Sequence, residues 1–201
     1  PSTPPNSSPA AKSMASASPN LEIEVKIALA SIPGLRQKLR GLGFHLLHRR
    51  VLEVNVVLDT VDKSLLGSRC MLRLRRAGSR HVLTFKGPPA VGVHKTREEL
   101  ELSVSDLDGM QAILSRLGYA PAFRYEKYRT EYSQKSGKGV LQIDETPVGN
   151  FLELEGSPRW IDRTARALGF RSADYITCSY GEIYRKYCAA RGIEPSHMVF
   201  K

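Results

Sequence analysis

The sequence predicts an α+β protein in which eight antiparallel strands close into a β-barrel, a tunnel with a charged interior, and helices pack on the outside. Three observations predict this fold. Eight segments alternate apolar and polar residues with a period of two, which is typical of strands with one apolar face. Four other segments have the spacing of amphipathic helices. On nearly every strand, two charged residues stand two positions apart and therefore share a face.

The chain is predicted to form one domain behind a short tail. Residues 1–20 are almost entirely Pro, Ser and Ala and carry one charge, at Lys12, which predicts disorder. We expect residues 21–201 to form a single domain, with Met14 as a candidate start of translation or the tail as a dispensable extension. The three cysteines lack zinc-site spacing and no secretory leader is visible, which together predict a reducing, cytoplasmic location.

The charge balance points to an anionic partner. The chain has 30 basic and 20 acidic residues, a net charge of +10. Nucleic acid, anionic lipid and phosphate groups are all compatible with that excess. Because no run of about 18 apolar residues is present, we expect neither a membrane-spanning helix nor a membrane partner.

The strand candidates are recognised by their apolar positions. In the first of them Leu21, Ile23, Val25 and Ile27 alternate with charged residues. Later segments repeat this alternation over shorter runs. The eight candidates span residues 21–29, 51–59, 71–75, 82–86, 97–104, 125–132, 140–144 and 151–155.

The helix candidates lie between the strands and have recognisable ends. Asp106 and Ser157 suit the N-cap position, and Pro158 suits a first turn. Residues 87–96 and 133–139 are predicted loops, the second a hairpin turn. The first three helices each end at a glycine, where we expect a left-handed cap. The helices span residues 33–43, 106–118, 158–168 and 180–190, and the capping glycines are Gly43, Gly118 and Gly169.

The charged strand faces decide between two architectures. An open sheet with one solvated face is the plain alternative, since most polar strand faces are wet. Solvated faces are usually rich in Thr, Ser, Gln and Lys, whereas here ionic residues of both signs recur. If the helices cover the apolar faces, the ionic faces turn inward, and about eight strands can close around one ligand. The shared face holds the acids Glu22, Glu24, Glu99, Glu101, Asp144, Glu153 and Glu155 and the bases Lys26, Arg73, Arg75, Lys86, Arg97, Lys127 and Arg129.

Such an interior predicts a particular kind of ligand, because buried charges are costly unless they are paired. Lysine and arginine bind phosphate oxygens. Clustered carboxylates hold Mg²⁺ or Mn²⁺, hard cations that prefer oxygen ligands. Together the two sets predict a site for a metal and a polyphosphate, as phosphoryl-transfer chemistry requires.

A series of motifs in fixed order strengthens this prediction. It begins with Glu-Ile-Glu-Val-Lys at 22–26 and ends near residue 187, and in this order it resembles the CYTH superfamily, the triphosphate tunnel metalloenzymes. Residues 117–123, followed by Glu126-Lys127, are most similar to the class IV adenylyl cyclase branch. The retained pairs at 73/75 and 153/155 are a pattern of the family at large. The other motifs are Leu58-Asp59-Thr60, Leu72-Arg73-Leu74-Arg75, Leu83-Thr84-Phe85-Lys86-Gly87-Pro88, Arg97-Glu98-Glu99-Leu100-Glu101, Lys127-Tyr128-Arg129, Ile143-Asp144-Glu145, the run 149–155 and Ser179-Tyr180.

The resemblance implies roles for the inward residues. Lys26, Arg73 and Lys127 are candidate catalytic residues, with Lys26 as proton acceptor because neighbouring cations can lower the pKa of a lysine. The alternative for the acids is cross-strand ion pairing, and for the bases a solvated strand face. Candidate ligands of Mg²⁺ or Mn²⁺ are Glu22, Glu24, Glu153 and Glu155, completed by Asp144, Glu99 and Glu101; candidate phosphate-binding residues are Lys26, Arg73, Arg75, Lys86, Lys127 and Arg129.

The expected function is metal-dependent chemistry on a triphosphate chain, in first place conversion of ATP to cyclic AMP and pyrophosphate. A triphosphatase acting on inorganic or organic triphosphate in the same tunnel is the alternative, and a non-catalytic polyphosphate- or nucleotide-binding module is the rival of another class. A homodimer is left open. Nucleic acid is not expected, because no aromatic platform accompanies the basic residues outside the strand faces, which are interpreted as a solvated helix face. These are Arg36, Lys38, Arg40, Arg49 and Arg50.

Overall fold

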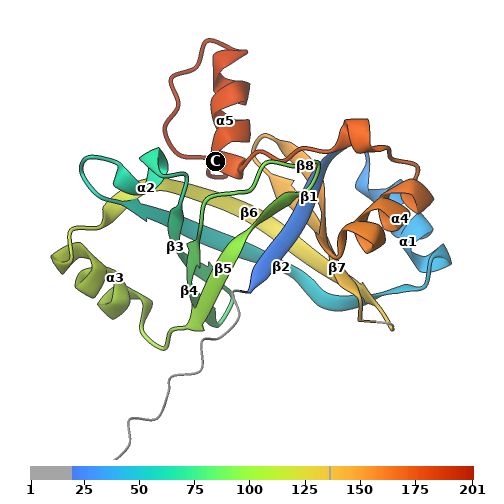
Figure 1. Ribbon diagram of the computed structural model, residues 1–201, viewed down its shortest axis with the longest axis horizontal. Coiled ribbons are helices and arrows are strands. Elements are labelled where there is room, and N and C mark those ends of the chain that lie inside the picture. The colour runs from blue at the N-terminus through green and yellow to red at the C-terminus, as the bar shows by residue number, and fades with distance from the viewer. Residues whose placement is uncertain (1–19, 136) are drawn as a thin grey trace, which may run out of the picture.

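The computed structural model describes residues 20–135 and 137–201 and shows the predicted closed barrel (Figure 1). Eight antiparallel strands follow one another around it in the order β1-β5-β4-β3-β2-β6-β7-β8. The predicted tail, apart from Asn20, and the start at Met14 lie outside the described residues. The strands are β1 (Leu21–Leu29), β2 (Phe44–Asp59), β3 (Met71–Ala77), β4 (Arg80–Lys86), β5 (Lys95–Ser103), β6 (Ala120–Gln134), β7 (Gly139–Thr146) and β8 (Gly149–Gly156).

All eight predicted strands are confirmed, but β2 and β6 are much longer than predicted. They pair with each other from Phe44–Gln134 to Asp59–Ala120 and form a long ladder that we call the arm, which β7 flanks beside β6 at one end and β3 flanks beside β2 at the other. Residues 45–50 of this arm are exposed, and without a buried face they show no apolar alternation. The register of the arm also shifts at two β-bulges, between Leu46 and Val51.

The four predicted helices are confirmed within a few residues at each end. Their stop signals act as expected, since the glycine after each of the first three has a positive φ, of 74°, 91° and 94° respectively. Two short elements were not predicted; one of them begins where the Asp59 carboxylate accepts the backbone N–H groups of Leu65 and Leu66. The helices are α1 (Ile32–Gly41), α2 (Ser64–Gly67), α3 (Leu107–Arg116), α4 (Pro158–Leu168), the 3₁₀ turn η1 (Ser172–Asp174) and α5 (Tyr180–Ala189).

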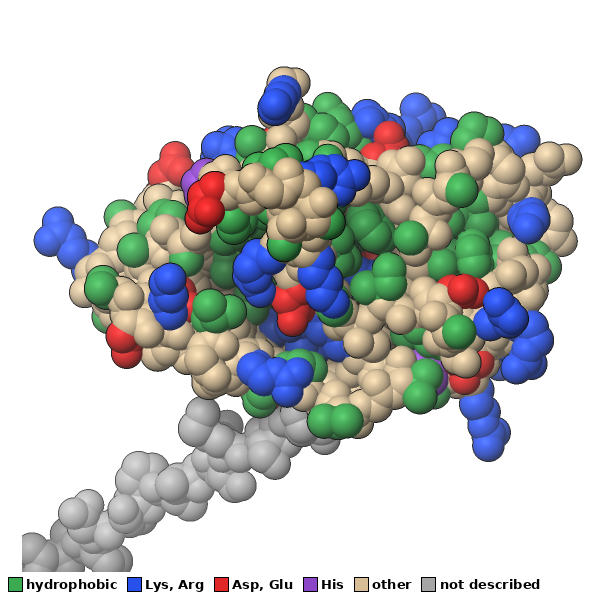
Figure 2. All heavy atoms as spheres, turned by 90° about the horizontal axis from the view of Figure 1, so that it is seen from above, with side chains coloured by type: hydrophobic (Ala, Val, Ile, Leu, Met, Phe, Trp, Pro, Cys, Tyr) green, Lys and Arg blue, Asp and Glu red, His purple; other side chains and the backbone are tan. Residues whose placement is uncertain are grey.

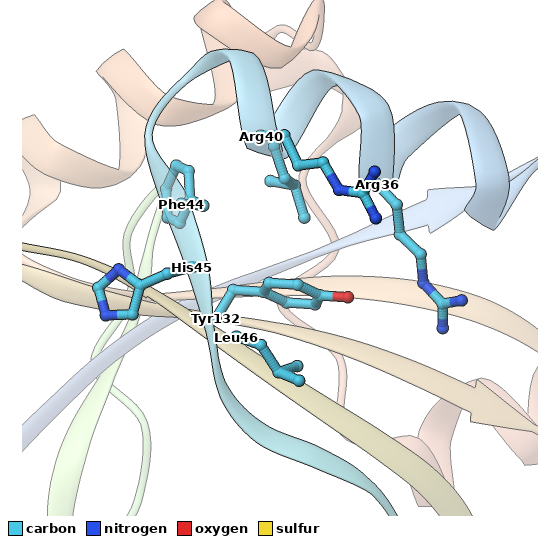
Figure 3. A pocket seen from close by; sticks show the side chains of 7 residues that line it. Arg36, Arg40, Phe44, His45, Leu46 and Tyr132 are labelled. Carbon is cyan, nitrogen blue, oxygen red and sulfur yellow. The ribbon is translucent and has the colours of Figure 1, made fainter.

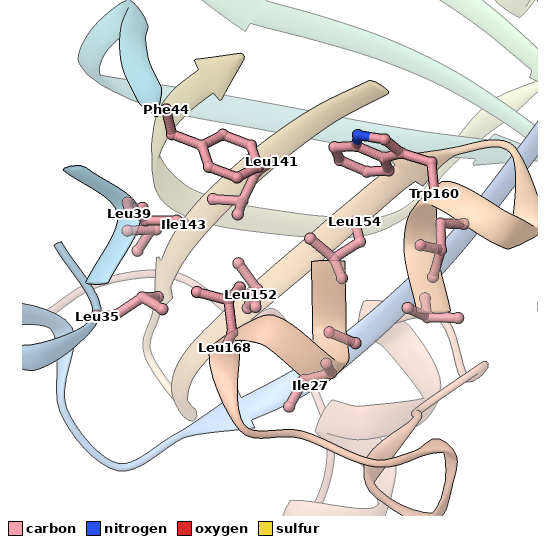
Figure 4. Close-up of a cluster of buried hydrophobic side chains, with 13 residues drawn as sticks. Ile27, Leu35, Leu39, Phe44, Leu141, Ile143, Leu152, Leu154, Trp160 and Leu168 are labelled. Atoms are coloured by element: carbon pink, nitrogen blue, oxygen red, sulfur yellow. The ribbon is translucent and has the colours of Figure 1, made fainter. Parts of the chain in front are cut away.

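The largest apolar core lies outside the barrel, between the outer faces of β1, β7 and β8 and the helices α1 and α4 (Figure 4). Trp160 of α4 is 2% exposed and meets the Phe44 ring edge-on, 6.3 Å between centroids. The indole packs so closely on Gly139 that a Cβ there would lie 2.6 Å from the ring. Because the apolar side chains of these strands are used on the outside, their alternate residues face inward.

Helices pack on the outside as predicted, but they cover only part of the apolar outer surface. Leu58, Leu74 and Leu114 form a smaller cluster under α3. On β5, however, Leu100 and Leu102 are 51% and 66% exposed. Across the described residues, no helix has the length and apolar composition needed to cross a membrane.

The segment after α4 forms backbone hydrogen bonds with two strands, β1 and β6, where each lacks a neighbouring strand. Where β5 stops pairing with β1, Ile176 takes over and exchanges two backbone hydrogen bonds with Lys26, of 3.1 and 2.8 Å. Near the C-terminus, Met198 bonds in the same way to the backbone of Arg124 and Glu126 on β6. Between these anchors α5 lies against the barrel and inserts Tyr180 into a cluster with Tyr125 and Phe151.

Candidate functional site: a charged tunnel

The barrel buries the charged side chains that the sequence places on one face. Ion pairs cross the interior from several strands, as a shared enclosed space requires. Glu99, Arg75 and Glu155 are partly buried, whereas the side chain of Glu101 is 46% exposed and lies at the margin. Nine predicted site residues are at most 8% exposed: Glu22, Glu24, Lys26, Arg73, Lys86, Lys127, Arg129, Asp144 and Glu153.

Acids and bases occupy different halves of the tunnel wall. The strands β8, β1 and β5 are neighbours and form what we call the acidic wall, and β4, β3, β2, β6 and β7 form the basic wall. Three cations lie on the acidic wall, and two acids, Glu53 and Asp144, lie on the basic wall. The acidic wall contributes Glu22, Glu24, Glu99, Glu101, Glu153 and Glu155 together with Lys26, Lys95 and Arg97; the basic wall contributes Lys86, Arg73, Arg75, Lys127 and Arg129.

On the acidic wall, lysines lie between the carboxylates. The Lys26 ammonium is 3.0 Å from Glu24 and 3.2 Å from Glu153. From the opposite wall, Lys86 reaches 2.6 Å from Glu22 and 3.0 Å from Glu99. Burial alone would raise the pKa values of Glu24 and Glu153, but Lys26 and other nearby cations outweigh burial and lower both.

The expected lowering of the Lys26 pKa is wrong for this structure. Burial alone would lower the pKa of the Lys26 ammonium, but Glu153 and Glu24 outweigh burial and raise it. The neighbours that decide the pKa are therefore carboxylates and not cations. Lys26 is held as a cation, which suits a phosphate-binding residue and not a proton acceptor.

On the basic wall, Asp144 of β7 organises the cations. Its carboxylate is fully buried and accepts hydrogen bonds from Lys127 at 2.8 Å and from Arg129 at 2.7 and 2.6 Å. The hydroxyl of Tyr180 donates a further hydrogen bond of 2.6 Å to it. Arg129 also contacts Glu153 of the acidic wall. Asp144, predicted as a metal ligand, thus has its oxygens occupied by cations and a hydroxyl.

Arg73 and Arg75 of β3 are held by neutral groups as well as by acids. Arg73 donates to the hydroxyl groups of Tyr125 and Thr84, each at 3.1 Å, and Arg75 donates to the Asn55 side-chain oxygen at 2.9 Å. Glu53 lies 3.4 Å from Arg75. Two buried atoms of this group, Arg73 Nε and Glu53 Oε2, have no hydrogen-bond partner among the described residues. Such atoms mark a place where a ligand or water can bind.

The chemistry of the acidic wall fits a divalent cation. Among the described residues, Glu155 has no cation within 4 Å, although Glu22 and Glu99 lie near it; burial first, and then these carboxylates, raise its pKa to about 7. The described residues contain no ready-made group of three acidic, His or Cys metal ligands, since lysines stand between the carboxylates. Metal binding at these oxygens therefore requires a lysine to move toward an arriving anion.

Sequence analysis missed several residues of this interior. Lys95 was assigned to a loop, yet it begins β5 and lies 3.2 Å from Glu24. Glu53 and Asn55 lie on the predicted strand 51–59, but they were not assigned to the site. Tyr125 was missed because the site was predicted from charged residues, and tyrosine is largely apolar. The period-two alternation could have identified Lys95 and Tyr125, because Lys95 lies two positions before Arg97 and Tyr125 lies two positions before Lys127, so each shares a strand face with a predicted inward residue.

Fold and interior together define a class of protein: antiparallel barrels that enclose an ionic tunnel and carry helices outside. The chain belongs to the CYTH domain family, whose sequence pattern matches residues 20–172. A protein of Methanocaldococcus jannaschii, named provisionally as an adenylate cyclase, is 28% identical over 137 residues, which are 68% of this chain and 77% of that protein.

Solved structures share the fold. A protein of Vibrio parahaemolyticus, also described provisionally as an adenylate cyclase, superposes with a TM-score of 0.73 at 19% identity, over 83% of this chain and 98% of that one. A protein of Pyrococcus horikoshii gives 0.70 at 23% identity, over 82% and 98%. A Hippeastrum protein, described as an adenylyl cyclase with a dominant triphosphatase activity, gives 0.63 at 19% identity, over 87% and 97%.

Proposed function

We propose that this chain is a divalent-metal-dependent enzyme that hydrolyses a triphosphate chain inside the tunnel. One observation carries the proposal: a basic wall with organised arginines and lysines faces an acidic wall where Glu155 has no cation within 4 Å among the described residues. A triphosphate needs the first, and the metal that accompanies it needs the second. Membership of the CYTH domain family supports an enzyme with such a substrate.

The basic wall would bind and orient the phosphates. Arg73, Arg75 and Arg129 offer planar guanidinium groups that suit bidentate contact with phosphate oxygens, and Lys86 and Lys127 add mobile point charges. Asp144 already fixes Lys127 and Arg129, and Glu53 and Asn55 already fix Arg75. These three cations therefore need little rearrangement on binding. Charge placed in advance in this way stabilises the charge that develops as a phosphoryl group is transferred.

The acidic wall would hold Mg²⁺ or Mn²⁺ through Glu22, Glu24, Glu153 and Glu155, with Glu99 beside them. When bound, the ion polarises phosphate oxygens and offsets the charge of the leaving group. Lys26 and Lys86, which now neutralise these acids, would turn toward the phosphates. Asp144 is better explained as the residue that positions Lys127 and Arg129 than as a metal ligand.

Cyclisation of ATP is the second candidate, and the name of the M. jannaschii relative favours it. The described interior favours the triphosphate chain itself, because most of the buried side chains that line it are ionic or hydrogen-bonding and would contact phosphates. The description of the Hippeastrum structure names a dominant triphosphatase activity, which also supports placing triphosphate hydrolysis before cyclisation.

Phosphorus NMR distinguishes these candidates. The full chain is incubated with Mg²⁺ or Mn²⁺ and either ATP or inorganic triphosphate, with an EDTA-treated sample as control. We expect orthophosphate and pyrophosphate from inorganic triphosphate, and no turnover in EDTA. Cyclic AMP and pyrophosphate from ATP would establish the cyclase instead. Binding of both compounds without turnover would contradict an enzyme and leave a polyphosphate-binding module.

A further inference from the structure

The outer surface carries a second concentration of positive charge, separate from the tunnel. A groove of about 340 Å³ runs between α1 and the arm formed by β2 and β6, and a hollow of about 270 Å³ adjoins it. Basic side chains are dense at the end of the molecule that carries α1 and α4 (Figure 2). Six residues matter for the argument: Arg36, Arg40, Arg49, Arg50, Thr130 and Tyr132.

A β-bulge brings two of these arginines to the groove. His48 pairs with Glu131 and Val51 with Arg129, so Arg49 and Arg50 together stand opposite the single residue Thr130. Bulges of this kind redirect side chains and are frequent beside functional sites. The basic residues interpreted from the sequence as one helix face thus come from two elements. Lys38 is separate from them, since its ammonium donates to the Leu168 carbonyl.

The arginines of the groove differ in how they are neutralised. Arg50 is fixed by Glu145, with contacts of 2.9 and 3.1 Å, and its guanidinium lies 3.4 Å from the centre of the Tyr128 ring. In the part of the chain that the structure describes, Arg36, Arg40 and Arg49 have no carboxylate within 4 Å. Positive charges gathered without a counter-charge repel one another, and an anion relieves that repulsion.

Polar groups of the arm face the same space. Thr130 lines the groove and is only 3% exposed. Its hydroxyl has no hydrogen-bond partner among the described residues. Tyr132 lines both the groove and the adjoining hollow, and Figure 3 shows the hollow with the Tyr132 hydroxyl directed toward the side where Arg36 and Arg40 extend from α1. A buried hydroxyl without a partner calls for a ligand or a water molecule.

We propose that this groove is a binding site for a small phosphorylated anion, of the size of an inorganic oligophosphate or a nucleotide phosphate group. Arginines and hydroxyls are the groups that hold phosphate oxygens by charge-assisted hydrogen bonds. The volume is that of a small-molecule site and not of an extended track for nucleic acid. The inference does not depend on the reaction proposed for the tunnel.

Amide NMR shifts of the full chain, titrated with pyrophosphate in EDTA, test the proposal. We expect two groups of shifting residues, one in the tunnel and one in residues 36–50 and 128–133. Arg36→Gln/Arg40→Gln should weaken the groove response about tenfold or more and leave the tunnel response in place. The matched control Arg159→Gln/Arg163→Gln removes the same charge, at the same spacing, from exposed positions of α4.

A second variant separates binding from folding. Thr130→Val replaces an unpartnered hydroxyl with a methyl group of similar shape, so it should keep or raise the melting temperature while weakening pyrophosphate binding in the groove. Unchanged binding in both groove variants would overturn the proposal. So would equal shifts with chloride at the same ionic strength, or stronger binding of an oligonucleotide or anionic vesicles than of pyrophosphate at equal phosphate concentration.

Discussion

On the basic wall of the tunnel, Lys127 and Arg129 share Asp144, and Arg75 is shared by Glu53 and Asn55. On the acidic wall, lysines neutralise most carboxylates but Glu155 has no cation within 4 Å among the described residues. Lys127, Arg129 and Arg75 of the basic wall are therefore held in place before any ligand arrives, whereas the acidic wall is short of positive charge at Glu155. A preformed wall suits binding of an anion, and a wall that lacks cations suits recruitment of a metal.

The largest expected effect comes from the residue that shows this difference most clearly. We expect Glu155→Gln to lower triphosphate turnover by at least about 100-fold at ordinary metal concentration, because loss of metal contact costs several kcal/mol in the transition state. Higher metal concentration should restore part of the activity. The melting temperature of the metal-free protein should not fall, because the substitution breaks no ion pair and reduces repulsion from Glu22 and Glu99.

The control for this variant is Glu98→Gln, the same change at a half-buried position of β5 whose parity is opposite to that of the inward Glu99. It should leave turnover within about twofold, because the side chain of Glu98 is directed away from the tunnel. Wild-type activity of Glu155→Gln across a metal titration would contradict the division of roles between the walls. A fall in its melting temperature would show that Glu155 is a structural partner instead.

Substitutions on the basic wall should change KM for the triphosphate, in contrast to the turnover change expected for Glu155→Gln. Arg75→Gln is expected to raise KM for the triphosphate about 10- to 100-fold, since a charged hydrogen bond is worth about 1.5–3 kcal/mol. Added metal should not reverse this loss. Arg75→Lys keeps the charge, so its KM should lie between those of the wild type and Arg75→Gln. Arg76→Gln, on the exposed outer face of the same strand, should leave KM nearly unchanged. If added metal restored the KM of Arg75→Gln, the proposed division of roles between the two walls would be wrong.

These residues also show what the sequence can and cannot predict. Period-two alternation was enough for the eight strands and for the inward acids and bases, because a strand fixes which side each residue faces. It could not predict the β2 bulges, which place Arg49 and Arg50 opposite one residue and break the period. The pKa of Lys26 was also out of reach, since it depends on Glu153, a residue 127 positions away that only pairing of β1 with β8 brings close. Lys95 follows a Pro- and Gly-rich stretch whose loop signal hid the start of β5.

The smallest expected effect concerns pH and the phenol of Tyr125, which lies beside Arg73 on the basic wall. Burial alone would raise the pKa of Tyr125, but Arg73 and then Arg75 and Lys127 lower it to about 8. Above that pH a phenolate 3.1 Å from Arg73 cancels part of the positive charge that would hold the substrate. KM should therefore rise about threefold to tenfold between pH 7.5 and 9.5, an interaction on the order of 1 kcal/mol.

Tyr125→Phe should remove this rise, because phenylalanine cannot ionise, while effects of pH on the substrate and the metal stay the same in both proteins. The measurement is the ratio of the two KM values across the pH range, which cancels those shared effects. A ratio that changes near pH 8 ties the anion affinity of the basic wall to the charge of Tyr125. Parallel profiles would mean that Tyr125 only positions Arg73, and that the basic wall keeps its full charge at alkaline pH.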